Sequence, residues 1–258
     1  MQPSRFAGKV GVVTAAAGGI GSATARAFAV EGAHVVLVDI NDDAGTGVCQ
    51  SLLAEGLAAE YRHCDVSKGD EVSELFGIIS AQQDRIDFAV NTVGGSGEGD
   101  VPGVELHQQT ESAWDGTIAV CLRTTFLCME QEIKSMLETG GGSIVNVSSM
   151  AGLRVTPYAS PAYSAAKAAV NHLTRFAAVA YAERSIRVNA VAPGLTATPN
   201  AVAAMGDGVI DEVAVAFHCI PRVALPADQA NAIVWLCSDE AAMVTGHILP
   251  VDGGWDAK

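Results

Sequence analysis

Seven short runs of apolar, largely β-branched residues alternate with longer helical stretches along nearly the whole chain of 258 residues. Because these runs are continuously apolar, they predict strands that are buried on both faces of a sheet. Strands that alternate with helices pair in parallel through right-handed crossovers. The expected strands cover residues 9–14, 34–39, 60–65, 87–91, 142–148, 185–191 and 248–251. With no linker or internal repeat in the sequence, we expect one α/β domain over residues 1–258, a doubly wound parallel seven-stranded sheet with helices on both faces.

The composition argues against several classes of function. The chain has 29 acidic and 15 basic residues, and its net charge of −14 disfavours binding to nucleic acid or to an anionic membrane. No apolar run approaches the roughly 18–20 residues of a membrane span, and the first eight residues lack a secretory core. The six cysteines show no CxxC pair and no cluster with histidine. We therefore expect reduced thiols in a cytoplasmic protein without a metal site.

A glycine-rich turn over residues 14–21 lies between the first expected strand and a helix that extends to about Glu31. Glycines there let the backbone approach a pyrophosphate, to which the helix N-terminus offers free N–H groups. The turn does not match G-x-G-x-x-G, and a tight turn without a ligand is the alternative. Asp39 ends the second strand 18 residues after Gly21, close to the ~20 expected for a carboxylate that binds ribose hydroxyls. A cap for the next helix is the alternative role of Asp39.

Charge then separates the two nicotinamide cofactors. Between Lys9 and Arg62 the only basic residue is Arg26, so this segment offers almost nothing to pair with a 2′-phosphate. Asp39 would also repel such a phosphate. We therefore expect NAD rather than NADP, unless a basic group from elsewhere in the fold reaches the site.

Tyr163 and Lys167 lie four residues apart in a long expected helix, so their side chains share one face. A nearby cation favours phenolate, which predicts a Tyr163 pKa below its usual value of about 10 and a role as acid and base. Taken alone, a Tyr-x-x-x-Lys pair is common by chance.

These features occur together with several further motifs in a fixed order, and as a set they resemble the short-chain dehydrogenase/reductase family over essentially the whole chain. The motifs are the turn at 14–21, Asp39, 64–66 (CDV), 91–94 (NTVG), 146–149 (NVSS), Tyr163 with Lys167, 187–194 (RVNAVAPG) and 251–254 (VDGG). The resemblance implies a Rossmann-like fold and hydride transfer between a nicotinamide cofactor and a secondary alcohol or ketone.

The resemblance also implies roles for individual positions. Ser149 matches the serine that hydrogen-bonds the substrate oxygen, Tyr163 the proton-transfer residue, and Lys167 the lysine that tunes the tyrosine and holds the nicotinamide ribose. Residues 191–198 match the segment that frames the nicotinamide. The positions that it assigns to cofactor binding are Thr14, Ala17, Gly19, Ile20, Gly21, Asp39, Ile40, Asp65, Val66, Asn91, Gly94, Pro193, Gly194 and Thr198, together with Tyr163 and Lys167.

The sequence departs from the family pattern at three places. Ala15 replaces the first turn glycine, which a methyl group tolerates only if the residue keeps negative φ. Thr92 and Val93 replace the usual Asn-Ala. Cys121 replaces the catalytic asparagine, which in the family supports a helix kink whose backbone carbonyl holds a water in the relay to the lysine. Because a backbone carbonyl does that work, we expect Cys121 to be a buried substitute that permits activity, and a reactive cysteine is the weaker alternative.

Residues 195–221 form a predicted lid over the substrate. This segment contains no Lys or Arg, alternates Gly and Pro with apolar positions, and follows a strand end, where ligands of α/β proteins bind. An ordinary loop and helix packed on the core is the alternative. Met205 and Phe217, together with Tyr158, predict an apolar substrate pocket. Arg154 is a candidate anchor for a substrate carboxylate, although a solvent-facing position is the favoured interpretation.

The sequence therefore predicts an NAD-dependent oxidoreductase for a small-molecule secondary alcohol or ketone. A 3-oxoacyl carrier-protein reductase is an alternative, but such enzymes usually take NADPH and dock an acidic carrier protein, which Asp39 and the charge of −14 oppose. A non-catalytic NAD-binding regulatory protein is a second alternative, motivated by Ala15 and Cys121. The resemblance also implies a homotetramer, with the helix over 163–184 and the C-terminal strand at its interfaces.

Overall fold

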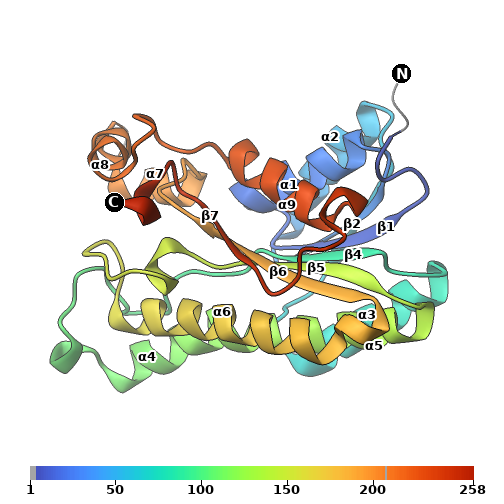
Figure 1. The fold of residues 1–258 in the computed structure, drawn as a ribbon, viewed down its shortest axis with the longest axis horizontal. Coiled ribbons are helices and arrows are strands. Elements are labelled where there is room, and N and C mark those ends of the chain that lie inside the picture. The colour runs from blue at the N-terminus through green and yellow to red at the C-terminus, as the bar shows by residue number, and fades with distance from the viewer. Residues whose placement is uncertain (1–3, 207) are drawn as a thin grey trace.

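A single parallel sheet lies at the centre of the fold (Figure 1). The computed structural model describes residues 4–206 and 208–258. Its strands lie in the order β3-β2-β1-β4-β5-β6-β7, and all six pairings are parallel. The strands are β1 (Val10–Thr14), β2 (His34–Asp39), β3 (Ala59–His63), β4 (Phe88–Asn91), β5 (Gly142–Val147), β6 (Ile186–Pro193) and β7 (Ile248–Val251). From β1 the chain winds outward to β3 and then returns to place β4 beside β1, so the winding direction reverses between these two strands. The predicted doubly wound parallel sheet is confirmed.

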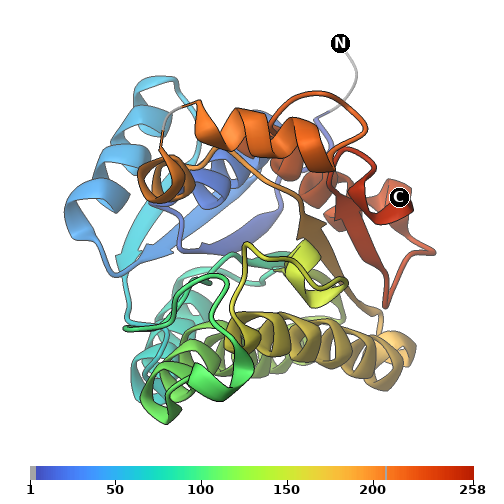
Figure 2. The same ribbon diagram turned by 90° about the vertical axis from the view of Figure 1, so that its left-hand side faces the viewer.

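Helices cover both faces of the sheet (Figure 1). One face carries α1 (Gly19–Val30), α2 (Asp42–Ala54) and α9 (Pro226–Cys237), and the other carries α3 (Gly69–Gln82), α4 (Glu111–Ile118), α5 (Thr124–Thr139) and α6 (Pro161–Tyr181). Val12 and Val13 are neighbours in β1 but belong to the cores on opposite faces, which is why this strand is apolar throughout. Helices α7 (Pro199–Met205) and α8 (Val209–Phe217) lie outside these layers, at the end of the molecule that also holds the C-terminus (Figure 2).

The predicted element boundaries shift by one or two residues. The third strand ends at residue 63 rather than 65, because the Cys64 N–H donates to the Asp39 carbonyl and the Asp65 carboxylate turns the chain by accepting from Ser67. The sixth strand begins at residue 186 because Ser185 has a φ of 59°. The predicted helix over 163–184 begins at residue 161, ends at 181 and continues as a 3₁₀ turn through 184. Over the described part of the chain, no helix is both long and apolar enough to cross a membrane.

Candidate active site

The carboxyl ends of β1, β4 and β5 bring the predicted site residues to one edge of the sheet, where the winding reverses. Thr14 is paired in register with Asn91, and Asn91 with Asn146 of β5. The Thr14 hydroxyl accepts a hydrogen bond from the N–H of Thr92 at 3.2 Å, which ties the two strand ends together. Ligands of doubly wound sheets bind at such a switch point.

The turn after β1 reverses tightly around Ala15. The Ala15 carbonyl accepts from the Gly18 N–H at 3.1 Å, and a Cβ on Gly21 would lie 2.2 Å from the Ala15 oxygen, so Gly21 permits this close approach. Ala15 itself has a φ of 48°. The condition of negative φ is therefore not met, and the chain holds an alanine in the left-handed region at a cost of about 1–2 kcal/mol.

The N-terminus of α1 offers a place for an anion, because the helix begins at Gly19 with no side-chain cap and no acidic residue in its first turn. A Cβ on Gly19 would lie 3.0 Å from the Thr198 side chain, so the start of α7 faces this turn. The structure thus brings together Gly19 and Thr198, which lie far apart in the sequence.

Asp39 faces the same turn from the end of β2. Its Oδ2 accepts from the Ala17 N–H at 2.9 Å and its Oδ1 from the Asn41 N–H at 2.9 Å. Asn41, not Asp39, caps α2, since its side chain accepts from the Ala44 N–H at 3.0 Å. The carboxylate is therefore held beside the anion-binding turn rather than used as a helix cap.

Three further positions predicted to bind the cofactor, Ile40, Asp65 and Val66, lie in the connections that follow β2 and β3. Ile40 exposes 59% of its surface, whereas Val66 is buried. The Asp65 carboxylate accepts from the N–H and the hydroxyl of Ser67, at 3.0 and 2.7 Å. Arg26, the basic residue nearest in sequence to Asp39, is engaged by Glu55 on the surface.

Tyr163 and Lys167 project from the first turns of α6. Ser160 caps this helix by accepting from the Tyr163 N–H at 3.0 Å, and its hydroxyl donates to Asp100 at 2.7 Å. The ammonium of Lys167 lies 5.7 Å from the centre of the Tyr163 ring and donates to the Val147 carbonyl at 2.8 Å. The two side chains thus lie near each other, and Lys167 contacts the last residue of β5.

The electrostatics of this pair differ from the prediction. Burial raises the pKa of Tyr163, with a smaller contribution from Cys121, while the Ser149 hydroxyl acts in the opposite direction by hydrogen-bonding the phenol oxygen. Burial also lowers the pKa of Lys167, which is 2% exposed. The prediction of a Tyr163 pKa below its usual value is therefore wrong for this structure, because burial disfavours the charged phenolate.

Ser149 lies two residues after the end of β5 and hydrogen-bonds Tyr163. Its oxygen also accepts from the Ala151 N–H at 3.1 Å and so caps the short 3₁₀ turn Met150–Gly152. A Cβ on Gly94 would lie 2.6 Å from Nζ of Lys167, so a side chain at position 94 would displace the ammonium. The structure therefore brings Gly94, Ser149, Tyr163 and Lys167 into one site.

Cys121 lies in a π-helical turn over Ala119–Arg123, between α4 and α5. Its thiol donates to the Gly95 carbonyl at 3.1 Å, and the Gly95 N–H lies 3.5 Å from Sγ. The Cys121 carbonyl accepts from the Thr125 hydroxyl at 2.8 Å. The helix is thus irregular here without an asparagine side chain, and the fully buried thiol links it to the loop after β4.

Sequence reasoning missed a buried carboxyl group behind the site. Glu132 of α5 is fully buried, and Asn91 donates to its Oε2 at 3.0 Å and to Oδ1 of Asn146 at 3.0 Å. Burial raises the pKa of Glu132 to about 8. The available signal was its spacing, since Cys128, Glu132 and Met136 recur every four residues and so share the buried face of α5.

The predicted substrate contacts come from three segments. Phe217 packs edge-on against Tyr158, with ring centres 5.5 Å apart, and against Trp255 at 4.7 Å. Trp255 was not predicted, and it completes an aromatic cluster at the end of α8. Arg154 instead pairs with Asp256 at 3.0 Å and donates to the Lys258 carbonyl. Met205 ends α7 and is half-buried, outside this cluster, while position 207 of the predicted lid lies outside the described residues.

No group of three His, Cys, Asp or Glu side chains that could hold a metal ion occurs among residues 4–206 and 208–258. The polar groups of the site are hydroxyls, the Lys167 ammonium, the half-buried Asp39 carboxylate and the N-terminus of α1. Such a set suits an anionic dinucleotide and a neutral oxygen substrate.

Comparison with known proteins identifies the family. The family model described as Enoyl-(Acyl carrier protein) reductase matches residues 14–256. The chain is 41% identical over 252 residues to cis-4-hydroxycyclohexanecarboxylate dehydrogenase of Sinomonas cyclohexanicum, with 98% of each chain covered. A short-chain type dehydrogenase/reductase from Mycobacterium ulcerans has a similar structure, with a TM-score of 0.91 and 30% identity over 98% of this chain and 91% of that one. A 7α-hydroxysteroid dehydrogenase complexed with NADH and 7-oxo glycochenodeoxycholic acid gives a TM-score of 0.89 and 32% identity, with 98% and 96% covered. Sheet order, motifs and these similarities agree, and the chain belongs to the short-chain dehydrogenase/reductase family of oxidoreductases.

Proposed function

We propose that this chain is an NAD-dependent dehydrogenase/reductase that interconverts a cyclic secondary alcohol and its ketone. The observation that carries the proposal is that Ser149, Tyr163 and Lys167 lie together beside Gly94. The Lys167 ammonium lies 5.7 Å from the centre of the Tyr163 ring. A hydroxyl, a phenol and a cation in this arrangement can orient an oxygen and exchange a proton with it. A non-catalytic role would not require these three groups together.

The cofactor end supports NAD over NADP. The uncapped start of α1 suits the pyrophosphate, and Asp39 beside it suits the two hydroxyls of an unphosphorylated ribose. Arg26 is paired with Glu55 and so offers no free cation for a 2′-phosphate. When bound, the nicotinamide ring supplies or accepts the hydride.

The chain's own residues handle the oxygen and the proton. Because burial keeps Tyr163 protonated, the phenol is set to donate its proton to a carbonyl oxygen in the direction of reduction. In the direction of oxidation the phenolate, formed once that proton has left, takes the proton of the alcohol. The Ser149 hydroxyl contacts the phenol and holds the same substrate oxygen. Lys167 contacts the Val147 carbonyl, which fixes its ammonium near the phenol and within reach of a ribose.

The aromatic cluster favours a cyclic substrate. Flat, apolar walls from Tyr158, Phe217 and Trp255 suit an alicyclic ring better than a flexible chain, because a rigid ring loses little conformational freedom on binding. Two of the similar proteins carry cyclic substrates or ligands in their names. Residues 195–221 close over this ring as a lid. We assign no carboxylate anchor to Arg154, since Asp256 already engages it.

We also propose a cytoplasmic homotetramer built from one domain per chain. Phe176 and Val179 expose 67% and 85% of their surface on α6, and Met243 exposes 96% before β7, so both faces expected at the interfaces carry exposed apolar side chains. All six cysteines are free, which suits a reducing compartment. Light scattering that returns a monomer would contradict the assembly.

Initial rates of NADH formation test the activity. The panel holds 4-hydroxycyclohexanecarboxylate, cyclohexanol, a hydroxysteroid and a linear secondary alcohol, each with NAD and with NADP. We expect turnover with NAD, faster for cyclic alcohols, and an Asp39→Asn variant in which the preference for NAD falls about tenfold because the carboxylate charge is lost. Better rates with NADP would contradict the cofactor assignment. NAD binding without any turnover would favour the non-catalytic alternative, and Cys121→Asn on the same panel would then test whether the proton relay is interrupted there.

A further inference from the structure

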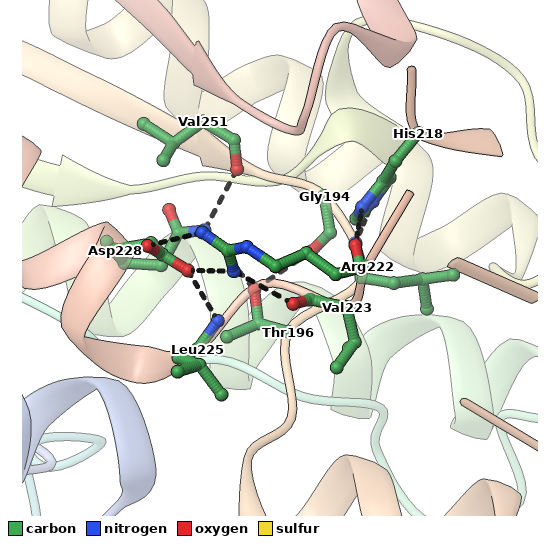
Figure 3. Close-up of polar contacts among 10 residues, drawn as sticks. Gly194, Thr196, His218, Arg222, Val223, Leu225, Asp228 and Val251 are labelled. Atoms are coloured by element: carbon green, nitrogen blue, oxygen red, sulfur yellow. Dashed lines mark hydrogen bonds and ion pairs between the residues drawn. The ribbon is translucent and has the colours of Figure 1, made fainter. Parts of the chain in front are cut away.

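One histidine joins the two ends of the 195–221 segment. His218 follows α8 directly and is 3% exposed. Its Nε2 accepts from the backbone N–H of Leu195 at 3.2 Å, and its Nδ1 lies 2.8 Å from the Arg222 carbonyl oxygen (Figure 3). A backbone N–H can only donate and a carbonyl can only accept, so these contacts require a neutral ring with its proton on Nδ1.

The backbone around the ring is shaped to admit it. A Cβ on Gly194 would lie 2.7 Å from Nε2, and a Cβ on Gly253 would lie 2.9 Å from the His218 Cβ. The N–H groups of Cys219 and Ile220 both donate to the Gly253 carbonyl, at 2.7 and 2.9 Å. The imidazole is therefore wedged between the end of β6 and the segment that follows β7.

The Arg222 end of this contact is itself fixed. The guanidinium forms two hydrogen bonds with the Asp228 carboxylate, at 2.6 and 2.9 Å, and Oδ2 of Asp228 also accepts from the Leu225 N–H at 2.7 Å (Figure 3). Asp228 belongs to α9, a helix packed on the sheet. Residue 222 is thus held to α9, and His218, which contacts both the Arg222 carbonyl and the Leu195 N–H, holds the other end of the segment to residue 222.

The Leu195 end leads to the cofactor turn. The Leu195 carbonyl accepts from the Ala224 N–H at 3.0 Å, so the imidazole and residue 224 hold both backbone groups of Leu195. Three residues later, Thr198 caps α7 and faces Gly19. Residues 194–198 are the stretch proposed to frame the nicotinamide, so their placement depends on the His218 contact.

We propose that His218 is a positioning residue whose imidazole, by accepting from the Leu195 N–H and contacting the Arg222 carbonyl, holds residues 194–198 against the cofactor turn. The functional part of the proposal rests on the NAD-dependent activity proposed above.

The charged and titratable groups around the ring are already committed. They are Arg222 and Asp228, which pair with each other; Asp252, whose oxygens accept from the N–H groups of Gly254 and Asp256; Cys219, which donates to the Gly254 carbonyl; and Lys258, which donates to the Ala216 carbonyl. Among the described residues no carboxylate hydrogen-bonds the imidazole, so its hydrogen-bond partners are the Leu195 N–H and the Arg222 carbonyl.

Two substitutions of His218 distinguish the contact of Nε2 with Leu195 from the contact of Nδ1 with Arg222. In His218→Gln the amide oxygen can reach the position of Nε2 and accept from Leu195, and this group does not titrate. In His218→Asn the amide can reach the Arg222 carbonyl but not Leu195. Exposed His172 on α6 gives a matched control, His172→Asn. A thermal melt shows that each variant folds.

Amide hydrogen exchange of the Leu195 peptide, corrected for intrinsic rates, reads the contact without requiring activity. Near pH 7.5 we expect wild type and His218→Gln to be protected and His218→Asn to exchange about tenfold faster. Equal protection of the Leu195 N–H in wild type, His218→Gln and His218→Asn would overturn the proposal. If His218→Asn does not fold, exchange of the Leu195 N–H in His218→Gln as fast as that of an unbonded amide would overturn it.

Kinetics then test the link to the cofactor. We expect His218→Asn to raise KM for NAD about tenfold while the Kd of ADP-ribose stays unchanged, because the Asp39 side of the site is untouched; His218→Gln should restore the wild-type KM. An equal effect on ADP-ribose would refute the assigned position. Absence of any turnover in wild type would contradict the proposed function, while the exchange result would still stand for or against the His218 contact.

Discussion

Helix α6 and the 195–221 segment, which we propose as a lid, are held in different ways. Helix α6 is 21 residues long and buries eight of them, including Lys167. Helix α7 buries none, and α8 buries only Ile210 and Ala214. The proposed lid is instead secured at its ends by directed contacts of His218 and of the Arg222–Asp228 pair. Groups that exchange protons need the precision that core packing provides, whereas a cover over a substrate must be released, which a few polar contacts allow.

The largest effect on activity is expected when the phenol oxygen of Tyr163 on α6 is removed. In Tyr163→Phe we expect kcat to fall about 100- to 10,000-fold, because the substrate oxygen loses its proton partner while the ring still packs. The melting temperature should change little. Tyr181→Phe, on the same helix, is the control. A kcat within a few-fold of wild type would show that another group moves the proton.

A substitution in the aromatic cluster of Tyr158, Phe217 and Trp255 tests whether the substrate binds against it. Phe217→Ala removes the ring that packs on Tyr158 and Trp255, so KM for a cyclic alcohol should rise about tenfold with little change in kcat. Val215→Ala, an exposed change in α8, should leave both unchanged. If KM for the alcohol is unaltered in Phe217→Ala, the substrate does not lie against this wall.

Glu132 of α5 makes the stability of the protein depend on pH. Glu132 keeps its proton in the native protein up to about pH 8, against a usual value of 4.5, so the native state binds one more proton than the unfolded state between these pH values. The free energy of unfolding should therefore fall as pH rises through that window, by at least about 1 kcal/mol between pH 6 and 8, and level off above it.

Urea unfolding of wild type and Glu132→Gln at several pH values checks this effect. The difference between the two proteins should narrow or reverse as the pH rises, because the glutamine does not titrate. Glu130 is exposed on the same helix and pairs with Lys134, so Glu130→Gln serves as the control. A difference between wild type and Glu132→Gln that is constant from pH 5 to pH 9 would mean that Glu132 does not titrate in this window.

The smallest expected effect is a change in the free energy of unfolding on substitution of Ala15, in the turn after β1. Ala15→Gly should stabilise the protein by about 0.5–1 kcal/mol, because glycine adopts a φ of 48° without strain but loses more entropy on folding. The midpoint of urea unfolding measures it. A lower midpoint for the glycine variant would show that the left-handed alanine is not strained.

The sheet and its order of elements could be predicted because strand–helix alternation is a local pattern. All seven strands were placed within two residues, since apolar runs such as 34–39 favour strands in a chain of this pattern. Boundaries that differ, as at Ser185, depend on single backbone angles. The left-handed Ala15 was missed for the same reason, because its conformation is imposed by the turn around it.

The sequence by itself determined the fold, the family and the set of polar residues near the strand ends, because spacing and motif order are properties of the chain. Only the tertiary structure decided the direction of the Tyr163 pKa, the burial of Glu132 behind Asn91, and the partners of Arg154 and His218. These depend on which side chains from distant segments exclude water or meet across the fold. Hydration and hydrogen-bond partners are set by that packing, and no local pattern in the chain encodes it.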